Sequence, residues 1–139
     1  MVVVDNSDKR ELGFVTKDSG AREKHTSGAV RDDRTGKGRY DLFSPIVLKR
    51  DAQLYERGAL KYDARNWEKG MPLSRYFDSG IRHAYNYLEG LRDEDHLAAV
   101  RWNFGALIHT EEMIHRGLMP KEYDDMPNYL TVDQRIKHD

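Results

Sequence analysis

The sequence contains no cysteine among its 139 residues, and this excludes disulfide bonds, zinc–thiolate sites, iron–sulfur clusters and cysteine nucleophiles. It also lacks a hydrophobic run close to the roughly 20 residues that cross a bilayer. The N-terminal region lacks the basic-then-apolar layout of a signal peptide. We therefore expect a cytoplasmic protein with no membrane partner.

An excess of charge of either sign is also missing. Lysine and arginine number 23 and aspartate and glutamate 24, which gives a formal net charge of −1. Nucleic-acid-binding domains usually carry a basic excess, so we expect no nucleic-acid partner, while small anionic ligands remain open. Hydrophobic residues make up only 38 % of the chain, and the mean hydropathy is −0.85. A monomer of this composition would bury a small core, which favours self-association.

The chain reads as one all-α domain with three parts. Residues 1–43 are polar and rich in glycine, serine and threonine, and predict an arm or lid with no strand beyond the N-terminal valines. Residues 44–117 carry helical periodicity and predict a helical core. Residues 118–139 are polar, contain Pro127, and predict a C-terminal tail.

Capping signals predict three main helices in the core. Ser44 followed by proline is typical of a helix start. A second helix is expected from about Pro72 to Gly90. The third is expected to begin after an N-cap at Asp93 and to end at Gly117, which stands where a left-handed cap would lie.

Polar side chains interrupt the apolar faces of the first and third helices. Asn103 has Ala99 and Leu107 on its own face, and His96 precedes them on the same row. Buried amides and imidazoles need partners, so the two form either a structural pair or part of a site. Glu56 lies among small apolar neighbours, and its carboxylate needs either a basic residue or a metal ion.

The second helix offers further candidates with open interpretations. Asp78 and Arg82 are four residues apart, a spacing typical of a solvated ion pair. His83 shares a row with Tyr76 and Tyr87, and this aromatic face either packs in the core or stacks on a planar ligand. The acids that precede His96 favour a helix-dipole role first and a ligand role second.

A glycine-flanked basic segment precedes the helices. In Gly36–Arg39, two glycines expose backbone N–H groups while Lys37 and Arg39 supply positive charge. The segment suits a phosphate, although a solvated basic turn explains it as well. Acids, imidazoles and this basic segment together predict a site for a metal–phosphate ligand in a helical bundle.

An ordered series of motifs resembles the phage-type dATP/dGTP diphosphohydrolase family, the MazZ-like proteins. The resemblance covers about residues 27 to 115. It is carried by SGAVRD at 27–32, GKGRYDL at 36–42, YERGALKY at 55–62, RNWEKG at 65–70, PLSRY at 72–76, Asp78, Arg82–His83, EDHLAA at 94–99 and Trp102–Asn103.

The resemblance implies a MazG-like all-α fold and divalent-metal-dependent cleavage of a purine deoxynucleoside triphosphate to the monophosphate and pyrophosphate. It also implies a phage role, in a host cytoplasm, in which dGMP supplies 2-aminoadenine nucleotide synthesis and dATP is removed. Relatives in the wider superfamily assemble as dimers or tetramers, so a homodimer or homotetramer is expected.

The chain departs from MazG-like enzymes in one respect, because the ExxE and ExxD motifs are absent at the corresponding places. We therefore expect Mg²⁺ or Mn²⁺ to be held by Glu56, Asp78, His83 and Asp95. Catalytic roles are expected for Glu56, Asp78 and His96. Substrate contacts are expected from Lys37, Arg39, Lys61, Asn66, Arg82 and Asn103, with Tyr76, Tyr87 or Trp67 stacking on the purine.

Two other functions remain open. An HD-type phosphohydrolase would release tripolyphosphate, but the adjacent Asp95–His96 pair stands in the reverse order for that class. A non-catalytic helical module would bind nucleotides without turnover. Product analysis separates the three possibilities.

Overall fold

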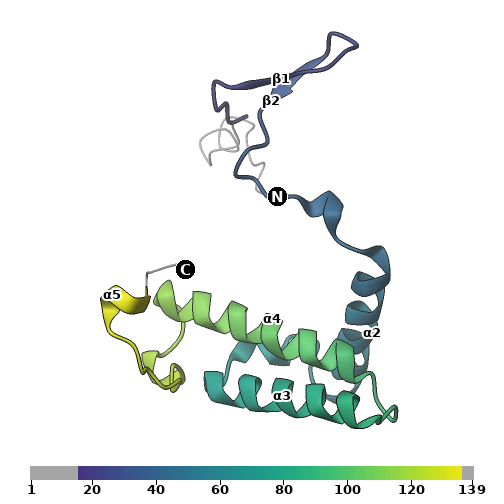
Figure 1. Ribbon diagram of the computed structural model, residues 1–139, viewed down its shortest axis with the longest axis vertical. Helices are drawn as coiled ribbons and strands as arrows, with labels where there is room; N and C mark the ends of the chain where they lie inside the picture. The colour runs from purple at the N-terminus through teal and green to yellow at the C-terminus, as the bar shows by residue number, and fades with distance from the viewer. Residues whose placement is uncertain (1–15, 136–139) are drawn as a thin grey trace, which may run out of the picture. The chain divides into compact units, whose positions relative to one another are not determined.

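The computed structural model describes residues 16–135, so the N-terminal valines and residues 136–139 lie outside the described part. The chain divides into two compact units between Leu42 and Phe43. Helices dominate the described residues, which confirms the all-α class (Figure 1). None of the helices within residues 16–135 is long and apolar enough to cross a membrane.

The first unit contains a β-hairpin that the sequence did not predict. Strands β1 (Arg22–Lys24) and β2 (Val30–Asp32) pair antiparallel, with Arg22 opposite Asp32. The Asp32 carboxylate accepts hydrogen bonds from the Ser19 hydroxyl and the Lys37 ammonium, each at 2.6 Å, and these hold its pKa far below the usual range. The expectation that this region holds no strand was therefore wrong. A short 3-10 helix, η1 (Tyr40–Leu42), ends the unit.

Helix α2 (Pro45–Lys61) opens the second unit at the predicted position. The Ser44 hydroxyl accepts a hydrogen bond from the backbone N–H of Val47, and proline occupies the first turn. No residue of α2 is fully buried, and Leu48 is 61 % exposed. Helix α2 packs mainly against one neighbour, α4, which covers only part of its surface.

Helices α3 (Leu73–Glu89) and α4 (His96–His115) form the centre of the unit and lie side by side (Figure 1). Gly90 ends α3 with a φ of +106°, and Gly117 follows α4 with a φ of +73°, as predicted. The predicted N-cap of α4 was wrong. Asp95, rather than Asp93, accepts the hydrogen bond from Ala98 N–H.

The hydrophobic core is small and lies between α3 and α4. Its buried row on α3 runs through Tyr76 and Gly80, whereas Phe77 and Ile81 are 42 % and 37 % exposed. Gly80 decides this register, because a Cβ at its position would lie 3.3 Å from atoms of Asn103 and Phe104 on α4. The apolar residues of the core are Leu73, Tyr76, Ala98, Ala99 and Ala106.

The close approach at Gly80 gives a stability prediction. Replacing Gly80 with valine is expected to lower the free energy of unfolding by about 2 kcal/mol, because a branched side chain forces α3 away from α4. Gly105→Ala is the matched control, since its Cβ would meet no atom within 4 Å and a helical alanine is favoured over glycine. Chemical denaturation of both variants checks this. Equal stability of Gly80→Val and the natural chain would contradict the packing described.

The segment after α4 returns to the start of α3. It contains a 3-10 helix, η3 (Lys121–Tyr123), and a last short helix, α5 (Val132–Arg135). The Asp125 carboxylate accepts a hydrogen bond from Ser74 N–H at 2.9 Å and another from the Ser74 hydroxyl. These bonds cap α3, which has no side-chain cap at its own N-cap position, Pro72.

The cap on α3 predicts a pH-dependent contribution to stability. Its hydrogen bonds from Ser74 lower the pKa of Asp125. A carboxyl with a lowered folded-state pKa stabilises the fold above its unfolded-state pKa, and this stability is lost as pH falls through the folded-state value. Asp125→Ala is therefore expected to melt below the natural chain near pH 7, with the gap closing as pH falls through the lowered folded-state pKa of Asp125. Asp133→Asn is the control, and a gap independent of pH would refute the cap.

Candidate functional site

The second unit contains a cleft of about 670 Å³. It lies between α2, the loop that contains the 3-10 helix η2 (Asn66–Lys69), α3 and α4. The volume falls in the range of about 300–1,000 Å³ that is typical of small-molecule sites. Of the residues predicted to bind substrate or metal, six line this cleft: Lys61, Asn66, Asp78, Arg82, His83 and Asn103.

Helix α3 contributes a carboxylate, a guanidinium and an imidazole to the lining of the cleft. Asp78, Arg82 and His83 all line the cleft, and Asp78 and Arg82 lie about one turn apart. The ion pair expected between Asp78 and Arg82 does not form. Instead, the Arg82 guanidinium donates to the Ser79 hydroxyl at 3.3 Å, and among residues 16–135 Asp78 forms no ion pair. Both charges are therefore available to a ligand.

Helix α4 contributes an amide whose orientation is fixed. Asn103 is 4 % exposed, and its Nδ2 donates to the backbone carbonyl of Ala99 at 2.8 Å. A carbonyl only accepts, so the amide nitrogen must face Ala99 and Oδ1 must face the other way. Within the described chain no donor reaches Oδ1, and Asn103 lines the cleft. The structural pair of Asn103 with His96, one of the two open interpretations, is not formed.

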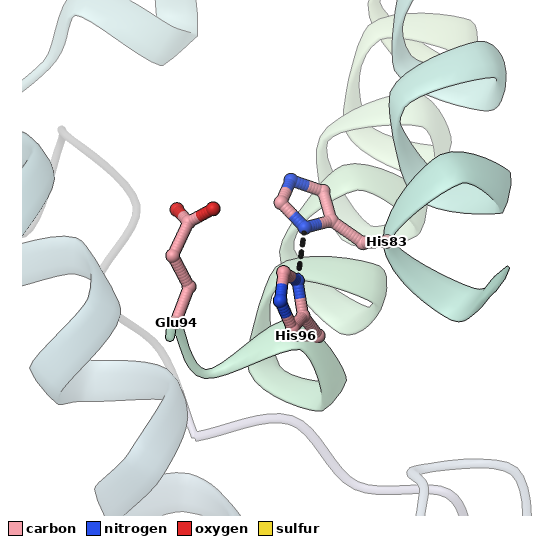
Figure 2. A group of neighbouring side chains, drawn as sticks. All are labelled: His83, Glu94 and His96. Carbon is pink, nitrogen blue, oxygen red and sulfur yellow. Dashed lines mark hydrogen bonds between the residues drawn. The ribbon is translucent and has the colours of Figure 1, made fainter. Parts of the chain in front are cut away.

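His96 instead pairs with His83 across the junction of α3 and α4. The two Nδ1 atoms lie 2.9 Å apart, and His96 Nε2 lies 2.8 Å from the Asp93 carboxylate. Figure 2 shows the two imidazole rings facing each other, with Glu94 beside them on the loop that leads into α4. One ligand atom from each of His83, Glu94 and His96 falls within a mutual distance of 4.8 Å.

The surroundings of this cluster lower two pKa values. For the imidazole this favours the neutral form, and for the carboxyl it favours the charged form. Partial burial, with a contribution from nearby Arg82, lowers the pKa of His83 and favours its neutral form. The hydrogen bond from His96 lowers the pKa of Asp93 and favours its carboxylate. A neutral imidazole and an ionised acid are the forms in which these groups bind cations.

Asp95, predicted as a metal ligand, is engaged elsewhere. It caps α4 and accepts a hydrogen bond from Arg50 Nε on α2 at 2.9 Å, which lowers its pKa to about 2. It does not belong to the cluster that His83, Glu94 and His96 form among the described residues. The contact with Arg50 ties α2 to α4 and so helps to shape the cleft.

Glu56, predicted as both catalytic residue and metal ligand, is exposed, and the cleft-lining residues of α2 in the described chain do not include it. Lys37 and Arg39 belong to the first unit, where Lys37 pairs with Asp32 and Arg39 with Asp41. The roles expected for these three residues stay predictions.

The aromatic residues named as base-stacking candidates have different surroundings. Tyr76 is 1 % exposed and packs in the core, so the packing interpretation holds for it. Tyr87 lies under the Arg92 guanidinium, 4.0 Å from its ring centre. Trp67 lines the cleft and is edge-on to Tyr55, which leaves it the aromatic candidate best placed for a purine.

Glu94 and Asn103 show which site residues helical periodicity in the sequence can identify and which it cannot. The buried face of α4 identified Asn103, whereas Glu94 lies on a loop and was given a helix-dipole role first and a ligand role second. The signal that could have selected it is its spacing two residues before His96, across the N-cap residue Asp95. Such spacing brings two side chains to one side of a helix start.

Comparison with known proteins identifies the family. The family model described as dATP/dGTP diphosphohydrolase, N-terminal, matches residues 27–120. The chain belongs to this family. No curated protein and no solved structure gives a significant match.

The part of the chain that matches the dATP/dGTP diphosphohydrolase family includes the whole cleft. It spans β2, α2, α3 and α4, together with the cluster at the α3–α4 junction. The family's description indicates a diphosphohydrolase that acts on a deoxynucleoside triphosphate. The cleft residues are therefore the place to look for its chemistry.

Proposed function

We propose that the cleft hydrolyses purine deoxynucleoside triphosphates, dGTP and dATP, to the monophosphate and pyrophosphate. Water adds to a phosphorus, the bond between the α- and β-phosphates breaks, and pyrophosphate leaves. The observation that carries this proposal is the family match, whose range holds a cleft with both cationic and acidic side chains. The dGMP formed would supply 2-aminoadenine nucleotide synthesis in a phage.

Cationic side chains bind the triphosphate in this proposal. Lys61 from α2 and Arg82 from α3 line the cleft from two sides. A guanidinium matches phosphate oxygens with paired N–H donors, and an ammonium acts as a point charge. Asn66 adds an amide on the adjoining loop. Together these groups offset the charge that a triphosphate carries.

The base binds toward Trp67 and Asn103. The free acceptor of Asn103, Oδ1, would receive an N–H of the purine, since guanine and adenine both carry donors on the Watson–Crick edge. The indole of Trp67 offers an apolar face beside it. Recognition through one acceptor and one apolar face fits a site that takes both purines.

Acidic side chains imply a divalent cation, Mg²⁺ or Mn²⁺. Asp78 and Glu94 line the same cleft as Arg82, and bare carboxylates would repel a triphosphate unless a cation lies between them. When bound, such a cation supplies activation of water and offsets charge on the leaving pyrophosphate. In this proposal Asp78 orients the attacking water or holds the cation.

The experiment that tests the proposed function is product analysis with purified full-length protein. The eight common nucleoside triphosphates are incubated with Mg²⁺ or Mn²⁺, and the products are resolved by ³¹P NMR. Monophosphate and pyrophosphate from dGTP or dATP support the proposal. Tripolyphosphate would indicate the HD-type reaction instead, and binding without turnover would indicate a nucleotide-binding module.

Self-association is the expected quaternary state and gives a further prediction. An apolar row of α3 runs through Phe77, Ile81, Tyr85 and Leu88, which are 42 %, 37 %, 66 % and 77 % exposed in one chain. Leu88→Asp is expected to shift the protein from a dimer or tetramer to a 16.2 kDa monomer, because a charge cannot be buried unpaired. Light scattering after size-exclusion chromatography measures this. A natural chain that elutes at 16.2 kDa contradicts the expectation.

A further inference from the structure

We infer that His83, Glu94 and His96 form a binding site for a transition-metal dication and that this site prefers Mn²⁺, Fe²⁺ or Co²⁺ to Mg²⁺. The catalytic meaning of the site rests on the proposed function, whereas the existence of the site does not. The inference is carried by three independent features: the spacing of the donor atoms, the partner of His96, and the chemistry of the donors.

The spacing of the two imidazoles fits a shared cation. Their Nδ1 atoms lie 2.9 Å apart, and a Glu94 oxygen completes a group within 4.8 Å. With metal–nitrogen bonds of about 2.1 Å, two ligands at a right angle place their nitrogens about 3.0 Å apart, and two tetrahedral ligands about 3.4 Å apart. The observed spacing therefore matches neighbouring positions of a six-coordinate ion.

The contact between His96 and Asp93 fixes the ring that would ligate. A carboxylate accepts hydrogen bonds, so His96 Nε2, 2.8 Å from Asp93 Oδ1, carries a proton. In neutral His96 the lone pair then lies on Nδ1, the atom that faces His83. A carboxylate behind a histidine in this manner is the common arrangement around metal-ligating imidazoles.

Glu94 completes the set from the cleft side. It is exposed, lines the cleft together with His83, and forms no ion pair within residues 16–135. His96 is buried below it with a relative exposure of 2 %. A cation at this place would be held by three protein ligands and would keep its remaining positions open toward the cleft, where the phosphates of a nucleotide would lie.

The donor chemistry selects the class of metal. Two imidazole nitrogens and one carboxylate suit divalent transition metals, whereas Mg²⁺ prefers an all-oxygen shell and retains most of its water. Affinity for such donors rises from Mn²⁺ through Fe²⁺ to Co²⁺. A purely structural histidine pair would show no such selectivity.

Metal binding is measured on the full-length protein after removal of metals, without nucleotide. Isothermal titration with Mn²⁺, Co²⁺ and Mg²⁺ is expected to give one strong site per chain for Mn²⁺ and Co²⁺, with Mg²⁺ at least about 100-fold weaker. Electron spin echo spectra of bound Mn²⁺ are expected to show coupling to ¹⁴N. Equal affinity for Mg²⁺ and Mn²⁺, or bound Mn²⁺ without nitrogen coupling, would overturn the inference.

Variants locate the site without relying on activity. Glu94→Gln, at an exposed position that the fold tolerates, and His83→Ala are each expected to weaken Mn²⁺ binding about 30-fold or more, and Asp93→Asn about 10-fold. His115→Ala removes an imidazole from the last turn of α4, far along that helix from His96. It is the matched control and should bind Mn²⁺ normally. Unchanged binding by both Glu94→Gln and His83→Ala would overturn the inference.

The outcome for the metal site can be separated from that for the proposed function. Nitrogen-coupled Mn²⁺ in a protein that hydrolyses no nucleotide supports the site and overturns the function. Hydrolysis of dGTP with Mg²⁺ by a protein whose Mn²⁺ lacks nitrogen coupling supports the function and overturns the site.

Discussion

Asp78→Asn is expected to lower kcat for dGTP by about 100- to 1,000-fold, equivalent to roughly 3–4 kcal/mol of transition-state stabilisation. Asp78 lies on the cleft side of α3, and no cation among the described residues neutralises it. A carboxylate beside a triphosphate site fits a role in holding a cation or orienting water. Asparagine has nearly the same shape as aspartate but lacks the negative charge that both roles need.

The division of this effect between kcat and KM identifies its cause. If Asp78 only added negative charge near the phosphates, its removal would tighten substrate binding and lower KM while leaving kcat unchanged. A fall in kcat of less than about threefold would therefore contradict the assignment. Glu89→Gln, at the end of the same helix, removes an exposed acid that does not line the described cleft and serves as the control.

Arg82→Ala is expected to lower kcat/KM for dGTP by about 100-fold, mainly through KM, because it removes a charged donor pair from the phosphates. The Arg82 side chain contacts only the Ser79 hydroxyl among the described hydrogen-bond partners, so little of its charge is used within the fold. Steady-state kinetics with natural and variant protein measure the change.

Two further variants make the expectation for Arg82 specific. Arg82→Lys should recover part of the loss, since a lysine keeps the charge but not the paired geometry. Arg116→Ala removes an arginine that is paired with Glu112 after the end of α4, and should leave kcat/KM unchanged. Equal losses for Arg82→Ala and Arg116→Ala would show a general charge effect and contradict a role for Arg82 in the cleft.

Local signals predicted the helices well because capping is a property of neighbouring residues. Ser44, Gly90 and Gly117 marked the ends at which the helices begin or stop. The N-cap of α4 was misplaced by two residues, since Asp93 and Asp95 both suit that position. The structure separates them: Asp93 receives the imidazole of His96, and Asp95 remains for the cap.

The β-hairpin could not be predicted from alternation of polar and apolar residues. Each of its strands has only three residues, and a side-chain period of two cannot be recognised over that length. The two shortest hydrogen bonds to Asp32 come from Ser19 and Lys37, which lie outside the strands. Such polar contacts leave no periodic pattern in the sequence.

Which candidates share a cleft follows partly from single helices and partly from how helices meet. Asp78, Arg82 and His83 were named from α3 alone and all line the cleft, while their roles stay predictions. The pairing of His83 with His96 depends on the packing of α3 against α4, which no pattern within either helix reveals. For Glu56, periodicity identified an unusual residue but not the direction in which its face points.

The central claim is that nucleotide and cation meet in the cleft of the second unit. Crystals grown with Mn²⁺ and an α,β-imido analogue of dGTP test it directly, because the analogue resists cleavage between the α- and β-phosphates. We expect the triphosphate beside Lys61 and Arg82, the guanine beside Asn103, and anomalous density for Mn²⁺ between His83 and His96. An analogue bound outside the cleft, with no Mn²⁺ at the two imidazoles, would contradict this account.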